Sequence, residues 1–175
     1  MTSHIFFVDA ETDGLYGPFL SVAAMVTDQL GAEIDRFYGA LYPQQVVITD
    51  PWVQENVFPS LSRAETFFET DTALLEAFWA FWLHYREDCL CVADVPVPVE
   101  ARLFAKCVAA DPFVRTFQGP YPLMDLSTLL YSRGIDPDAD RTNLSGLPCK
   151  RHDALDDVRM TAAIWQKLVN GIWND

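Results

Sequence analysis

Residues 5–10 form a short apolar run that ends in two acids, and this stretch constrains the chain most. Asp9 is the only polar residue in the run, and Glu11 follows it just before a turn signal at residues 13–14. A short apolar run bounded by a turn predicts a buried strand. Because side chains alternate along a strand, Asp9 and Glu11 are expected on the same face as Phe7.

The two acids have two explanations. Neighbouring carboxylates repel each other and raise each other's pKa unless a cation lies between them, and hard oxygen ligands of this kind bind Mg²⁺ or Mn²⁺. Alternatively, Asp9 and Glu11 simply face water at the end of a strand. Further acids at suitable positions downstream would favour the metal site.

The composition predicts one globular domain that spans residues 1–175. Hydrophobic residues make up 50% of the chain and aromatic residues 13%, which excludes an intrinsically disordered protein. No apolar run reaches the length of a membrane span, and the first residues lack the basic region of a signal peptide. We therefore expect a cytoplasmic protein without a membrane partner.

The net charge limits the nucleic-acid functions that the chain could have. It is −13, from 25 acids and 12 bases, which argues against a protein that grips long nucleic acid through many phosphate contacts. A nucleic-acid enzyme remains compatible with this charge, because divalent cations in a site can bind a few phosphates locally.

The order of the predicted elements indicates an α/β fold. Three strands joined by short turns are followed by alternating helices and strands, which is typical of a mixed sheet covered by helices. The fourth strand follows a helix, so we expect it to run parallel to the first. The predicted strands cover residues 5–10, 19–27, 34–42, 89–93 and 121–124, and the predicted helices cover residues 51–58, 72–86, 100–110, 126–132 and 153–173.

The last predicted helix carries a second group of acids. Asp153 is placed to cap this helix, and Asp157 lies on the same helical stripe as the apolar residue Ile164, whereas Asp156 lies on a more polar face. An acid that points into the core needs a partner, and a metal ion would supply one. His152 precedes the helix in a loop, either aimed at the same place or simply exposed on the surface.

Two further acids lie in the middle of the chain. Asp94 follows the fourth predicted strand, and Glu100 opens the next helix. Either could complete a carboxylate cluster, because adjacent parallel strands end at the same edge of a sheet and ligands bind there. Asp94 could also be an ordinary loop acid, and Glu100 an acid that favours the first turn of a helix.

Taken together, these motifs resemble those of the DEDDh nucleases, the 3′–5′ exonucleases with a ribonuclease H-like fold. The matching motifs are Asp9-x-Glu11, a carboxylate after the fourth strand, and His152-x-Ala154-x-x-Asp157. They span nearly the whole chain and lie in the expected order. The resemblance implies a ribonuclease H-like mixed sheet of five strands, three antiparallel and then two parallel, with helices on both faces.

The second motif departs from the family pattern. The family has a strand, then His-Asn-Ala-x-Phe-Asp, whereas this chain has Asp94-Val-Pro-Val-Pro-Val-Glu100. Glu100 fits the helix-opening position of the family's aspartate. Asp94 has the usual residue type but comes too early, so it remains the second choice.

The resemblance also implies a mechanism and a set of site residues. Two ions, Mg²⁺ or Mn²⁺, would bind across Asp9, Glu11, Asp157 and either Glu100 or Asp94, and His152 would act as general base. The substrate would be a single-stranded 3′ end or a short oligonucleotide, RNA or DNA, and the product a nucleoside 5′-monophosphate. The residues implied in substrate binding are Thr12, Gly14 and Leu15 after the first motif, and Lys150 and Arg151, with Arg141, in the loop before His152.

Two other functions stay open at this level. The altered second motif and the acidic surface are compatible with a module that has lost catalysis and binds nucleotide ends or a protein partner. A two-metal phosphohydrolase of small nucleotides is the other alternative. A homodimer is also compatible with the aromatic helix at residues 72–86, although packing in the core would explain that helix equally well.

Overall fold

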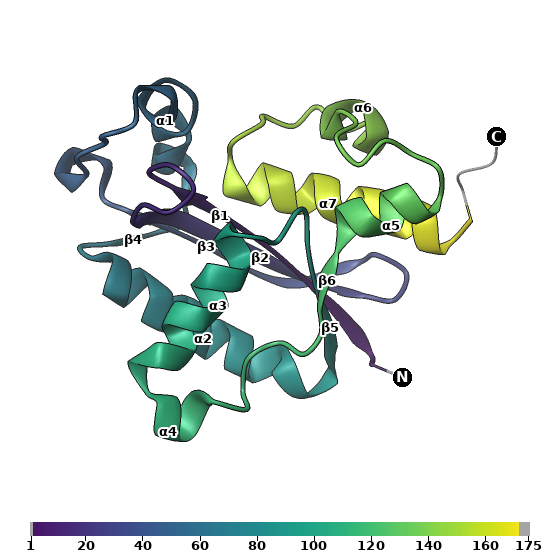
Figure 1. The fold of residues 1–175 in the computed structure, drawn as a ribbon, viewed down its shortest axis with the longest axis horizontal. Coiled ribbons are helices and arrows are strands. Elements are labelled where there is room, and N and C mark those ends of the chain that lie inside the picture. The colour runs from purple at the N-terminus through teal and green to yellow at the C-terminus, as the bar shows by residue number, and fades with distance from the viewer. Residues whose placement is uncertain (1, 172–175) are drawn as a thin grey trace.

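The computed structural model describes residues 2–171, and its centre is a six-stranded sheet in the order β4-β3-β2-β1-β5-β6 (Figure 1). The strands β1 to β3 form an antiparallel meander, and β5 pairs with β1 in parallel, as predicted. The strands are β1 (His4–Thr12), β2 (Phe19–Asp28), β3 (Glu33–Leu41), β4 (Thr66–Phe68), β5 (Cys89–Ala93) and β6 (Leu123–Asp125).

The strand count is the one difference in the sheet. The prediction had five strands, and the structure adds β4, which pairs with β3 in parallel at the edge of the sheet. A strand of three residues is too short to show an alternating pattern in the sequence. The predicted fold class, a mixed α/β sheet with three antiparallel and then parallel strands, is confirmed.

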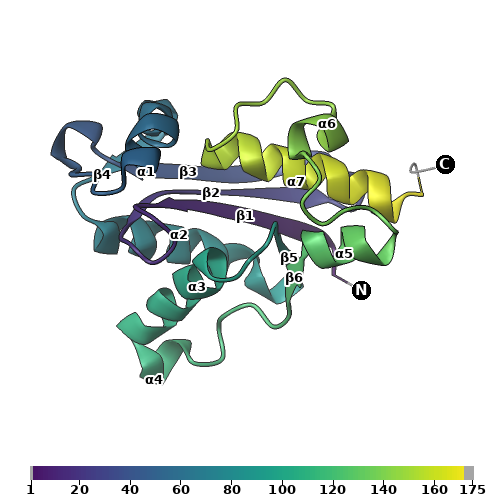
Figure 2. The same ribbon diagram turned by 45° about the horizontal axis from the view of Figure 1, so that its top comes forward.

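Helices cover both faces of the sheet (Figure 2). One face packs against α7, with α5 and α6 beside it, and the other packs against α2 and α3. The helices are α1 (Pro51–Asn56), α2 (Asp71–Tyr85), α3 (Val99–Ala110), α4 (Pro112–Arg115), α5 (Leu126–Ser132), α6 (Arg141–Ser145) and α7 (Ala154–Val169), with 3₁₀ helices η1 (Pro43–Gln45), η2 (Phe58–Arg63) and η3 (Arg86–Asp88).

Strand β1 divides its side chains between the two cores. Ile5 and Phe7 are buried toward α7, whereas Phe6 and Val8 are buried toward α2 and α3. This alternation continues to Asp9, which therefore lies on the α7 face, as the sequence predicted.

The aromatic residues of helix α2 pack against the sheet of their own chain. Phe78 and Trp82 contact the ring of Phe6 edge-on, with ring centroids 6.3 and 5.1 Å apart. Packing in the core thus accounts for the aromatic residues of α2. The helix begins one residue earlier than predicted, because the side chain of Thr70, and not Asp71, accepts the hydrogen bond that caps it.

The other helices confirm the predicted caps and correct two loops. Asp153 caps α7 with its side chain, as predicted, and Asp50 and Asp125 cap α1 and α5 in the same way. The short helices η2 and α6 lie largely in stretches for which no helix was predicted. Helix α7 ends at Val169 rather than at residue 173, and residues 172–173 lie outside the described part of the chain.

Among the described residues, none of the helices has both the length and the apolar character that crossing a membrane requires.

The cap of α5 leads to a stability prediction. The Asp125 carboxylate accepts hydrogen bonds from Ser127 and Thr128. Burial alone would raise the pKa of Asp125, but these hydrogen bonds outweigh burial and lower the pKa. Asp125→Ala should therefore reduce the free energy of unfolding at pH 7 by about 1 kcal/mol.

The sign of the pH dependence follows from the lowered pKa. The stabilisation is complete above the pKa of an unfolded aspartate, about 3.9, and is lost as the pH falls through the folded pKa below it. Urea unfolding at pH 7 and below pH 4 measures both effects, with the exposed Asp138→Ala as control. An Asp125→Ala effect that stays constant down to pH 3 would contradict the assignment.

Candidate active site

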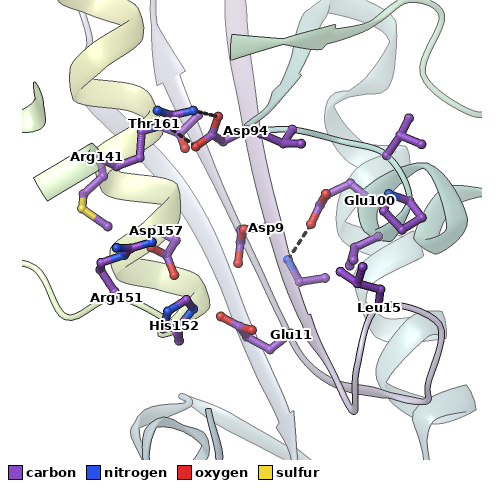
Figure 3. Close-up of a pocket in the computed structure, with 16 residues that line it drawn as sticks. Asp9, Glu11, Leu15, Asp94, Glu100, Arg141, Arg151, His152, Asp157 and Thr161 are labelled. Atoms are coloured by element: carbon purple, nitrogen blue, oxygen red, sulfur yellow. Dashed lines mark hydrogen bonds and ion pairs between the residues drawn. The ribbon is translucent and has the colours of Figure 1, made fainter. Parts of the chain in front are cut away.

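Three of the predicted acids meet at the end of β1. Asp9, Glu11 and Asp157 each offer an oxygen atom, and these three atoms lie within 4.8 Å of one another (Figure 3). Asp9 and Glu11 come from one face of β1, and Asp157 comes from the first turn of α7, which packs on that face. A strand and a helix far apart in the sequence therefore build one carboxylate cluster.

Glu100, in the first turn of α3, lies on the side of Asp9 opposite to Asp157 (Figure 3). Its side chain is buried, and its Oε1 accepts a hydrogen bond from the backbone N–H of Ala10 at 3.2 Å. Because Ala10 lies between Asp9 and Glu11 in β1, this bond fixes the Glu100 carboxylate beside both. Glu100 lies outside the group of three acids whose oxygens meet within 4.8 Å, but it lines the same cavity.

Asp94 lies in the same cavity but has a different partner. Both of its oxygens accept hydrogen bonds from the Arg141 guanidinium, at 2.6 and 2.9 Å. Arg141 also donates to the carbonyls of Pro137 and Ala139, so it ties the α6 segment to the end of β5. Arg141, which the sequence suggested for phosphate binding, is thus engaged in a bidentate ion pair.

The electrostatics of the cluster call for a cation. Burial, followed by repulsion from Asp157 and other acids, raises the pKa of Asp9 well above its ordinary value. The same causes raise the pKa of Glu11 to about 8, and burial raises the pKa of Glu100 to about 8 and that of Asp157 to about 7. Pairing with a cation would let these buried carboxylates be charged together at neutral pH, and an all-oxygen donor set fits Mg²⁺ or Mn²⁺.

His152 lines the same cavity and points toward the acids (Figure 3). Its ring contacts the edge of the Trp52 ring, with centroids 4.7 Å apart and planes at 80°. Burial, together with the Arg151 guanidinium, lowers the pKa of His152 below its ordinary value. The imidazole is therefore held in its neutral, proton-accepting form near neutral pH.

The cavity has two different walls. On the α7 side it is lined by Arg141 and Arg151, and on the α3 side by apolar residues that include Leu15 and Val97. Its volume is about 300 Å³. Lys150, which the sequence placed with Arg151, does not line this cavity: its side chain is exposed, and its backbone N–H donates to Asp156.

A second cavity of about 370 Å³ adjoins the first and is more apolar. It brings together the three residues predicted after the first motif, Thr12, Gly14 and Leu15. The Thr12 hydroxyl donates to the carbonyl of Gly14 at 2.6 Å, so toward a ligand it acts as an acceptor. Trp52 forms the opposite wall with half of its surface exposed.

Sequence reasoning missed three residues that hold this cavity. It gave Trp52 no role, although a tryptophan at the second position of a predicted short helix is itself a signal. The Asp13 carboxylate accepts three hydrogen bonds from Thr49 and Asp50, which joins the Leu15 loop to α1. Arg102 donates to the carbonyls of the same loop from α3. Such long-range contacts leave no local pattern.

Known structures match this fold. The E. coli exonuclease I–ssDNA complex with bound zinc ion superposes with a TM-score of 0.68, over 99% of this chain and 41% of that chain, at 17% identity. Exonuclease I from Methylocaldum szegediense matches with a TM-score of 0.66, over 97% of this chain and 41% of that chain, at 14% identity. The chain has the fold of exonuclease I. The likeness to a DEDDh-type 3′–5′ exonuclease, first indicated by the motifs, is thereby confirmed for the fold.

The similarity covers only part of each matched chain, and it is not detected by the sequence comparisons. The chain spans about two fifths of the matched exonuclease I chains, 41% in each of these two cases. No protein-family model matches the sequence. No curated protein matches it either.

Metal binding can be tested without an activity assay. Because the charged form of Asp9 is disfavoured in the folded state, Asp9→Asn should raise the melting temperature of the metal-free protein by a few degrees, about 2–4 °C per kcal/mol of relieved repulsion. Mn²⁺ should raise the melting temperature of the unmodified protein and leave that of Asp9→Asn unchanged. Thermal unfolding with EDTA or Mn²⁺ measures both.

The exposed Glu55→Gln is the matched control for the loss of one negative charge. It should respond to Mn²⁺ as the unmodified protein does. If millimolar Mn²⁺ leaves the melting temperature of the unmodified protein unchanged, the carboxylate cluster is not a metal site.

Proposed function

We propose that this protein is a metal-dependent 3′–5′ exonuclease that releases nucleoside 5′-monophosphates from single-stranded 3′ ends or short oligonucleotides. The observation that carries the proposal is the meeting of Asp9, Glu11 and Asp157 within 4.8 Å, in a fold shared with exonuclease I. Two of the matched E. coli structures are complexes of exonuclease I, one with ssDNA and one with a dT13 oligonucleotide.

The acids would hold the cofactor. Asp9, Glu11 and Asp157, with Glu100 on the other side of Asp9, form a donor set for two divalent ions, Mg²⁺ or Mn²⁺. When bound, such ions lower the pKa of a water molecule and offset the negative charge that develops on phosphate and leaving-group oxygens. Glu100 is the better candidate for the second motif, because both oxygens of Asp94 are already held by Arg141.

His152 would act as the general base. It takes a proton from the attacking water as the water oxygen bonds to the phosphorus of the last phosphodiester. The bond from that phosphorus to the 3′ oxygen of the preceding nucleotide then breaks, and the leaving oxygen takes a proton from solvent. The lowered pKa of His152 favours the neutral ring that this step requires.

The apolar cavity would hold the terminal nucleotide. Leu15 on one wall and the half-exposed Trp52 on the other offer apolar surface to a base, and aromatic stacking tolerates every base. The Thr12 hydroxyl, whose proton is used in the bond to Gly14, would accept from a sugar hydroxyl.

The charge distribution supports a short contact with the strand. Arg151 is the exposed cation on the wall of the metal cavity, and Lys150 lies next to it in the sequence. In a chain of net charge −13, phosphates farther from the site would meet an acidic surface. Single-stranded ends that present only a few phosphates therefore fit better than long duplexes.

A direct assay separates this function from its alternatives. With Mn²⁺, the protein should release 5′-monophosphates from the 3′ end of a labelled oligonucleotide, and Asp9→Ala should lose this activity by at least about a thousandfold, because the metal ligands act as a unit. A length series from mononucleotides to long strands distinguishes an exonuclease from a phosphohydrolase of small nucleotides.

Two outcomes would reject the proposal. Equal release by Asp9→Ala would mean that a contaminating nuclease is measured. No metal-dependent release from any DNA or RNA, together with retained oligonucleotide binding, would instead favour a binding module that has lost catalysis.

The second motif has its own test. Glu100→Gln should lower kcat far more than Asp94→Asn, because the Asp94 carboxylate is held by the Arg141 guanidinium through both oxygens. Glu100, in contrast, forms no ion pair with any described residue and is fixed to the backbone of β1 beside Asp9. Steady-state kinetics at saturating Mn²⁺ compare the two matched, isosteric substitutions. A larger loss for Asp94→Asn would assign the motif to Asp94.

A further inference from the structure

The backbone at His152 is strained. Its φ is +60°, in the left-handed region that residues other than glycine rarely adopt. A residue held in this way stores conformational strain, and it persists only where the surrounding structure enforces it. The contacts that enforce it come from residues 52–63, which lie about ninety positions away in the sequence.

Arg63, at the end of η2, forms ion pairs with two acids close to His152 in the sequence. One guanidinium nitrogen, Nη1, lies 2.8 Å from Asp153 Oδ2 and 2.9 Å from Asp156 Oδ2. Both acids are almost fully buried, with side chains 1% and 8% exposed, whereas the Arg63 side chain is 44% exposed. Arg63 thus covers two buried carboxylates from the solvent side.

The two acids bracket the His152 loop. The Asp156 carboxylate accepts from the backbone N–H of Lys150, two residues before His152, and Asp153 is the helix cap directly after it. Fixing both carboxylates therefore fixes both ends of the loop. In addition, Ser60 directs its hydroxyl to the carbonyls of Val57 and His152, at 2.7 and 2.8 Å.

We propose that Arg63 is a positioning residue that sets the orientation of the His152 imidazole, acting through Asp153 and Asp156. Together with Trp52, whose ring contacts that imidazole, the α1–η2 segment holds the histidine by its ring, its carbonyl and its flanking acids. The inference rests on the proposed role of His152 as general base. It adds a residue that touches neither the metal ligands Asp9 and Glu11 nor the substrate cavities.

A purely structural ion pair would stabilise the fold without changing the imidazole. The kinetic test therefore compares Arg63→Gln in two backgrounds. In the unmodified protein it should lower kcat by on the order of tenfold to a hundredfold and change KM less than about twofold, because a misplaced base affects the chemical step. In a His152→Ala background it should cause no further loss.

A spectroscopic test reads the imidazole itself. The chain has three histidines, His4, His84 and His152, so NMR of the imidazole protons gives few signals, and His152→Ala assigns the relevant one. The ring of Trp52, 4.7 Å away, displaces this signal by its ring current. Arg63→Gln should move the His152 signal and leave the signals of His4 and His84 in place.

Arg36→Gln is the matched control. Arg36 also bridges two acids, Glu33 and Glu65, at 2.8 and 2.7 Å, and it lies on β3 rather than on η2. It should change neither kcat nor the His152 signal. If Arg63→Gln does not fold, Arg63→Lys keeps the charge but contacts the two acids with a single ammonium group, and it should show a smaller change in the same readouts.

The outcomes separate the two proposals. An unchanged His152 signal in the folded Arg63 variant, or an equal loss of kcat with and without His152, would overturn the positioning role. If the unmodified protein has no nuclease activity at all, the proposed function fails, while the NMR comparison still decides whether Arg63 orients His152.

Discussion

The repulsion among buried carboxylates at the end of β1 is the interaction on which the rest of the structure depends. Three acidic oxygens lie within 4.8 Å of one another, and at that distance two charges interact by about 3–4 kcal/mol at an effective dielectric of 20. The N-termini of α3 and α7 point toward the cluster, since Glu100 and Asp157 lie in their first turns. A helix end contributes about 0.3–1 kcal/mol to a nearby acid, which is too little to offset several such pairs. Protonation or a bound cation can relieve this repulsion, and the proposed divalent cations would do so while the acids stay charged.

The sheet makes this concentration of charge possible because both of its faces are packed. Strand β1 lies between two hydrophobic clusters, so its end cannot turn Asp9 away from α7 without exposing Phe7 or burying a charge in the other core. The loops and short segments around the site are held in place by polar contacts instead. Asp13 and Arg102 hold the Leu15 loop, Arg141 holds the segment before α6, and Arg63 holds the loop of His152. The core therefore positions the acids, and ion pairs position the groups around them.

This difference between residues positioned by the core and residues positioned by ion pairs also explains which parts of the site could be predicted from the sequence. Asp9 and Glu11 follow from strand alternation and Asp157 from helical spacing, because periodicity decides which side chains face a packed surface. Asp156 shows the limit of that argument. Its helical position predicts a polar face, yet its side chain is buried by Arg63, which is 93 residues away in the sequence. Likewise, the sequence does not decide whether Glu100 or Asp94 is the acid of the second motif. In the structure, Arg141, which is 47 residues from Asp94, binds the Asp94 carboxylate and thereby favours Glu100. Such pairs leave no periodic pattern.

The charge of the whole chain bears on the proposed substrate. A net charge of −13 repels a polyanion at long range, so in the proposed function the binding energy would come from cations at the site and from the apolar cavity beside it. Such contacts would act on the last nucleotide and its neighbouring phosphate, and they would weaken less with salt than those of a long basic groove. The matched exonuclease I chains are more than twice as long as this chain, which spans 41% of their length. The carboxylate cluster of this chain lies within the part of the fold that it shares with them, so the shared part contains every residue to which the proposal assigns a role.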